Sequence, residues 1–130
     1  MTIKSLKRAS KKKIASLFDR WNKSLKTGDP DKIIANYAKN SMLLPTLSNK
    51  PRLTFADKKN YFKSFLKNKP SAKINTRKIE VGFDIAFDTG IYTFIFAKTK
   101  AIVKARYTFT YCFDGNKWLI SSHHSSKMPK

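Results

Sequence analysis

The sequence contains few cysteines and few glycines, and each shortage excludes a class of site. Cys112 is the single cysteine, so it has no partner for an internal disulfide and no second thiolate for a metal centre. We expect a buried thiol and a reducing compartment. The 4 glycines form no glycine-rich phosphate loop, and neither a nucleophile elbow nor metal-ligand spacing is present. We therefore expect no metal and no cofactor, and we assign no catalytic residue.

Long hydrophobic runs are also missing. No apolar stretch approaches the roughly 20 residues of a membrane-spanning helix. The N-terminus is basic, but the apolar core of a secretory signal does not follow it. We expect a protein without a membrane span, located in the cytoplasm.

Acidic residues are the most depleted group. Lys+Arg number 28 and Asp+Glu 8, for a formal net charge of +20, and Glu80 is the only glutamate. A nucleic-acid-binding protein would carry such a charge, because neutralised phosphates release counterions. Specific recognition commonly uses arginine, however, and only five of the basic residues are arginine. The charge predicts nonspecific binding to nucleic acid or to other polyanions.

Two other origins of the lysine excess stay open. A lysine-rich proteome would supply lysine, but the same codon bias would also supply glutamate. Deliberate positive supercharging of a natural scaffold would add lysine at the surface and leave the core, the caps and the turns unchanged. Supercharging predicts that almost every lysine side chain is exposed.

The composition indicates one folded domain. A hydrophobic fraction of 41% and an aromatic fraction of 13% exclude a disordered chain, and 130 residues are enough for one moderate core. We expect a basic N-terminal extension over residues 1–13 and a single domain over residues 14–130.

Apolar periodicity predicts helices in the first half of the chain. An amphipathic helix over about residues 5–27 is indicated by apolar residues spaced three and four apart, namely Ile14, Leu17, Phe18, Trp21 and Leu25. A short second helix begins at Asp29 and Pro30 and includes Tyr37. A third helix begins after Thr54 and stops before Pro70.

From residue 72 onward the period changes to two, which predicts strands. We expect strands over residues 72–82, 90–98, 101–112 and 117–124, after a short extended segment at 42–45. The intervening turns fall at residues 83–89, 98–100 and 113–116. The last three strands are close enough to form an antiparallel meander, and helices in front of such a sheet make an α+β fold.

Several short motifs resemble one known family. They include a turn and an aromatic-anchored strand that lead into a pair of histidines, and they occupy residues 17–22, 27–30, 43–46, 88–94, 105–109, 114–120 and 121–129. Together they resemble the association (hub) domain of calcium/calmodulin-dependent protein kinase II and its free-standing bacterial SnoaL-like relatives. The resemblance implies a cystatin-like cone, in which N-terminal helices pack on a curved, mainly antiparallel sheet. It also implies an oligomerising scaffold, although the wider superfamily holds enzymes, binders and scaffolds on one framework.

Strand faces suggest how subunits associate. In residues 91–97, apolar side chains occupy both faces of the strand. In residues 101–111, apolar and aromatic side chains fill one face. Helices cover only one side of a sheet, so we expect sheet-to-sheet dimerisation. A strongly curled sheet that buries part of its own outer face is the alternative. The resemblance implies a further step, the stacking of dimers into closed rings.

A ligand pocket is predicted inside the cone. Strict alternation places Trp118 and His124 on one strand face and His123 on the other, so His124 is either a pocket histidine or a structural one. The resemblance implies a small anionic ligand held by Arg106 and His124, with Trp21 and Tyr37 as the apolar walls.

An isomerase or cyclase of the same superfamily is the enzymatic alternative. Such enzymes need an inward aspartate. We place Asp84 and Asp88 in a turn and treat Asp29 and Asp57 as helix caps. Asp19, beside the apolar stripe of the first helix, is the one acid that we would test as a base. A surface salt bridge is the other role open to Asp19.

Overall fold

The computed structural model describes residues 8–129, which form helices followed by a five-stranded sheet. The sheet order is β1-β5-β4-β3-β2, with β1 parallel to β5 and the other neighbours antiparallel. The elements are α1 (Lys11–Lys26), α2 (Pro30–Ile34), β1 (Tyr37–Leu44), α3 (Phe55–Phe65), the 3-10 turn η2 (Leu66–Asn68), β2 (Pro70–Val81), β3 (Ile85–Phe96), β4 (Ile102–Phe113) and β5 (Trp118–Lys127). The expected α+β fold and the C-terminal meander are confirmed.

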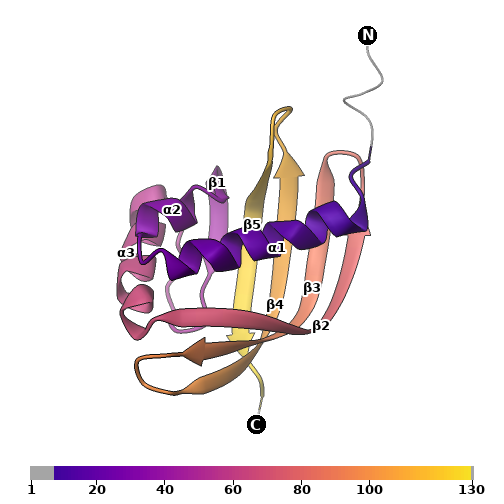
Figure 1. The fold of residues 1–130 in the computed structure, drawn as a ribbon. Coiled ribbons are helices and arrows are strands. Elements are labelled where there is room, and N and C mark those ends of the chain that lie inside the picture. Colours follow the sequence, from indigo (N-terminus) through magenta and orange to yellow (C-terminus); the bar gives the residue numbers. More distant parts are fainter. Residues whose placement is uncertain (1–7, 130) are drawn as a thin grey trace.

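Helix α1 lies across one face of the sheet (Figure 1). It begins at Lys11, later than predicted, because the Ser10 hydroxyl accepts a hydrogen bond from the Lys13 amide (3.0 Å) and caps the helix there. Residues 5–7 of the predicted helix lie outside the described residues. The predicted apolar stripe is buried along its whole length. Burial of each large apolar side chain contributes about 1.5–3 kcal/mol, so this stripe fixes the helix on the sheet.

Helices α2 and α3 lie at the β1 end of the sheet (Figure 1). Asp29 caps α2, and Thr54 caps α3 by accepting a hydrogen bond from the Asp57 amide (3.0 Å). Tyr37 does not belong to the second helix as predicted, because α2 ends at Ile34 and Tyr37 opens β1. Its side chain is nevertheless buried.

Strand β3 begins earlier than predicted. Gly82 donates a backbone hydrogen bond to the carbonyl of Ile85 (2.7 Å), which closes a tight turn and leaves β3 free to start at Ile85. Asp88 therefore lies within the strand and not in a turn. It shares the inner face with Tyr92 and Phe94, and its side chain is buried.

Strand β5 contains an irregularity that alternation alone does not predict. Thr110 pairs with Ser122 while Tyr111 pairs with Ile120, so Ser121 is an extra residue in β5. Such a bulge exchanges the two faces for every residue beyond it. His123 consequently turns inward and His124 outward, the reverse of the predicted orientation.

The outer face of the sheet is mixed rather than uniformly apolar. In β4, Ala105 and Tyr107 are buried on the inner face, and the alternate positions Lys104 and Arg106 are exposed. Large apolar side chains gather instead at the two ends of the β3–β4 pair, and the most exposed of them is Ile102, at 71%. Within residues 8–129, no helix combines the length and the hydropathy that a membrane crossing requires.

Candidate functional site

The centre of the candidate site is His123, the inward histidine of β5. Its side chain is only 3% exposed and lies between two tyrosines. The hydroxyl of Tyr37 is 2.9 Å from Nδ1, and the hydroxyl of Tyr92 is 3.2 Å from Nε2. Both ring nitrogens therefore have partners, as a buried imidazole requires.

Hydrogen bonds continue from both tyrosines. The indole nitrogen of Trp21 donates to the Tyr37 hydroxyl (3.1 Å). On the other side the Tyr92 hydroxyl donates to Ser125 Oγ (2.6 Å), and Ser125 is hydrogen-bonded to Thr46. A continuous chain of hydrogen bonds thus connects the middle of α1 to the loop after β1.

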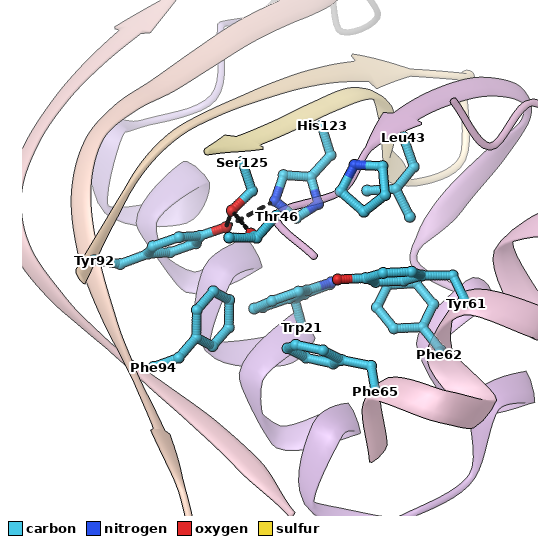
Figure 2. A pocket seen from close by; sticks show the side chains of 11 residues that line it. Trp21, Leu43, Thr46, Tyr61, Phe62, Phe65, Tyr92, Phe94, His123 and Ser125 are labelled. Carbon is cyan, nitrogen blue, oxygen red and sulfur yellow. Dashed lines mark hydrogen bonds between the residues drawn. The ribbon is translucent and has the colours of Figure 1, made fainter. Parts of the chain in front are cut away.

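Aromatic rings surround this chain and position the histidine. His123 stacks on Phe109, with ring centroids 4.0 Å apart and planes 18° apart, and Trp21 meets the histidine edge-on at 5.4 Å. Figure 2 shows His123, Ser125 and Tyr92 on one side of a cavity and the rings of Trp21 and Phe65 across from them. The cavity has about 10 Å³ of free space, roughly the space that one water molecule needs.

Burial also sets the charge of these groups. Desolvation, followed by the nearby His124, lowers the pKa of His123 to about 3, so the ring is neutral at neutral pH. Burial raises the pKa of Tyr37 and of Tyr92 well above the ordinary value, so both phenols keep their protons. The cavity is polar at one edge but carries no charge there.

Two of the four predicted ligand residues do not enter this cavity. Arg106 projects from the outer face of β4 and is exposed, because its inward neighbours Ala105 and Tyr107 occupy the alternate positions. His124 is also exposed, because the bulge at Ser121 turns it outward. The prediction that the side chains of Arg106 and His124 point into the cone is therefore wrong.

The other two predicted residues do lie inside. Trp21 lines the cavity, and Tyr37 supports it through its hydrogen bonds to Trp21 and His123. The prediction missed His123, because nothing in the alternation of this strand marks the extra residue at Ser121. It also missed Asp88, although alternation carried backward from Tyr92 through Gly90 places that residue on the inner face.

Asp88 forms the second polar cluster of the interior. Its carboxylate accepts two hydrogen bonds from Arg77, at 3.3 and 2.8 Å, and one from the Tyr107 hydroxyl at 2.8 Å. An inward aspartate is the group that a superfamily isomerase needs, but this one is occupied by an arginine and a phenol. Asp19 is exposed on α1, which does not suit a base acting inside the cone.

The surface carries the excess of positive charge. Among the described residues every lysine except Lys58 is exposed. This agrees with the distribution that supercharging predicts, but a natural basic surface would look the same. Among the same residues, no group of three or more His, Cys, Asp or Glu side chains is arranged to hold a metal ion.

The order of the strands and the helix across the sheet first define the fold class of the protein. A helix laid over a curved sheet of this order is the cystatin-like, NTF2-like fold. It is shared with a protein of cystatin-like fold from Nostoc punctiforme, which is 17% identical with a TM-score of 0.76 over 92% of each chain. A protein from Streptomyces avermitilis described as an NTF2-like dehydratase is 10% identical, with a TM-score of 0.81 over 92% of this chain and 96% of that one.

A narrower assignment follows from the family comparison. The model of the calcium/calmodulin dependent protein kinase II association domain matches residues 10–129, so the chain belongs to that family. A solved structure from Xanthomonas campestris, described as such an association domain, is 45% identical. It has a TM-score of 0.89 over 94% of this chain and 90% of that chain. Among curated proteins, none matches the chain.

Proposed function

We propose that this protein is an oligomerising scaffold whose subunits associate through the outer face of the sheet. The observation that carries the proposal is the set of large apolar side chains left exposed on β3 and β4, opposite the face covered by α1. They are Ile85, Phe87, Ile95 and Ile102. Membership of an association-domain family supports a second copy of the chain as the occupant of this face.

The arrangement of these side chains suits a two-fold contact. Ile95 and Ile102 are direct cross-strand partners at one end of the β3–β4 pair, while Phe87 lies near the other end. If two sheets pack face to face and antiparallel, the end with Ile95 and Ile102 on one sheet meets the end with Phe87 on the other. A stable interface of standard size buries roughly 1,600 Å², which this pairing would have to reach.

Charge opposes this association at low ionic strength. Each subunit carries a formal charge of +20, and Lys104 and Arg106 lie on the face that we propose becomes buried. Repulsion between exposed charges is screened beyond about 8 Å at physiological salt. We therefore expect dimers, and rings of dimers, to become more stable as salt is added.

Light scattering after size exclusion, with nucleic acid removed, tests the scaffold proposal. The protein should be dimeric or larger at about 0.15 M salt, and Ile102→Asp or Phe87→Asp should shift it toward monomer. Leu53→Asp is the matched control, because Leu53 is equally apolar and 51% exposed but lies outside the sheet. A wild-type monomer at every salt concentration would refute the proposal.

The His123 cavity supports a second function, the binding of a small polar ligand. Its combination of an aromatic wall with a hydrogen-bonding edge is typical of ligand sites. The free space of about 10 Å³ restricts such a ligand to a water-sized group unless the segment at Pro45 and Thr46 moves outward. Quenching of Trp21 fluorescence by small carboxylates, measured in a Trp118→Phe background and abolished by His123→Gln with the fold retained, would support this function. Unchanged fluorescence would exclude it.

A further inference from the structure

The hydrogen-bond chain through His123 has a fixed direction. The Trp21 indole can only donate, so Tyr37 accepts from it and is free to give its own proton to Nδ1 of His123. The neutral ring then carries its proton on Nε2 and donates to Tyr92, which donates to Ser125. The reverse direction would leave the Tyr37 proton without an acceptor in a buried place, which is costly.

This direction sets the roles at the outer end of the chain. Ser125 Oγ accepts the Tyr92 proton, and Ser125 and Thr46 are hydrogen-bonded to each other. Ser125 is buried, whereas Thr46 is only half-buried, so the Thr46 hydroxyl is the member of the pair that can turn toward the outside. A hydroxyl both donates and accepts, and its proton rotates to suit its partners.

The pair opens onto a hollow that is separate from the His123 cavity. The hollow has about 410 Å³ of space and lies between the loop after β1 and the end of β5. Thr46 and Ser125 line both spaces. The remaining walls include two lysines, the outward histidine and a further hydroxyl, namely Lys50, Lys127, His124 and Ser126. Among the described residues that line it, none is acidic.

We propose that this hollow is a binding site for a phosphate group carried by a small molecule. The two ammonium groups match the charge of a phosphate dianion, and the Thr46 hydroxyl, which lines the hollow, can donate to one of its oxygens. The hydrogen bond to Ser125 holds Thr46 in place, so little ordering of this side chain is needed when the ligand arrives. His124 thus contributes to an anion site, as the sequence suggested, but on the outer surface and without Arg106.

The test is a titration of the whole protein with inorganic phosphate at constant ionic strength in a chloride background. Backbone amide NMR should show saturable shifts at Lys50, Ser125 and Lys127. Lys50→Gln and Lys127→Gln should each weaken phosphate binding about tenfold, as expected for the loss of one charge-assisted contact. Lys23→Gln is the matched control, because Lys23 is an exposed lysine on α1 and should leave the affinity unchanged within about twofold.

The hydroxyl is tested separately from the charge. Thr46→Val removes the donor at nearly constant volume and should weaken binding about tenfold, while Thr46→Ser should restore it. Acetate, titrated in the same way, should bind more weakly than phosphate. The proposal is wrong if Lys23→Gln weakens phosphate binding as much as Lys50→Gln, if Thr46→Val has no effect, or if acetate binds as well as phosphate. None of these outcomes depends on subunit association, which light scattering reports independently.

Discussion

Arg77 and Asp88 form a two-point salt bridge across the β2–β3 pair, and only one partner reaches solvent. The Nη2–Oδ2 distance is 2.8 Å, the Asp88 side chain is 0% exposed and the Arg77 side chain 26%. The two strands bring the residues close, since Arg77 pairs with Gly90 and Asp88 with Ile79. The carboxylate therefore depends on Arg77 and Tyr107 for all of the hydrogen bonds that it accepts from side chains.

We expect Asp88→Ala to be among the most destabilising single substitutions of the inner face. The substitution leaves the buried Tyr107 hydroxyl without its acceptor and the partly exposed Arg77 guanidinium without its partner, which should cost about 1–3 kcal/mol. Urea unfolding measures the loss. Asp84→Ala, at an exposed turn position, should change the free energy of unfolding by less than about 0.5 kcal/mol. Equal effects in the two variants would show that the ion pair contributes nothing.

The buried His123 should make stability depend on pH. Its pKa is about 3 in the folded protein and about 6.5 when unfolded. The unfolded chain therefore binds the proton first, and stability decreases as the pH falls from about 6.5 toward 3, by about 1.4 kcal/mol per pH unit. Above pH 6.5 this contribution is complete.

Unfolding free energies at pH 5 and pH 7 should show this dependence in the wild type and lose it in His123→Gln. His124→Gln, which changes the exposed imidazole, should retain it. Nitrogen-15 NMR of the ring should report a neutral imidazole with the proton on Nε2 throughout this range. A titration of His123 with a midpoint between pH 6 and 7 would contradict the burial argument.

Gly90 is required because β2 passes too close for any side chain. A Cβ at this position would lie 2.0 Å from the carbonyl oxygen of Thr76, next to the register shift in β2. A backbone atom cannot yield as a flexible side chain would, so Gly90→Ala should cost at least about 1–3 kcal/mol. Thermal unfolding checks this. Thr89→Ala, the neighbouring substitution on the same strand, should have the smaller effect, and the opposite order would argue against steric crowding.

Lys58 should be a source of instability. It is the one described lysine that is buried, at 0% exposed, and its ammonium nitrogen has no hydrogen-bond partner. Burial lowers its pKa, which is the response of an amine that loses water without gaining an acceptor. Lys58→Met keeps the length of the side chain and should raise stability by about 1–3 kcal/mol. Lys63→Met, at an exposed position of α3, should be nearly neutral. A destabilised Lys58→Met would mean that the Phe55 ring, whose centroid is 5.7 Å from the ammonium, compensates the charge.

The sequence predicted the elements of this fold better than it predicted the site. The helical stripe of α1 and the meander follow from periodicity, since Trp21 and Phe109 each continue a regular pattern. The site depends on two local departures from the pattern. The extra residue Ser121 selects His123 over His124, and the tight turn at Gly82 brings Asp88 into a strand. The first departure is settled by cross-strand pairing, which one strand's sequence does not contain, whereas the inward position of Asp88 follows from the alternation that runs back from Tyr92.

Because β1 pairs with β5, the first strand cannot join the sheet until the last strand has been synthesised. β1 ends at Leu44 and its partner begins at Trp118, so some seventy residues must be synthesised between them before this edge of the sheet can form. Closing so long a loop costs conformational entropy of the chain, which is offset only when β1 and β5 make their contacts. During synthesis, Tyr37 and Leu43 therefore lack their β5 neighbours until that strand leaves the ribosome. The wall of the His123 cavity is completed late, and a nascent chain that stalls before Trp118 should be a good substrate for chaperones.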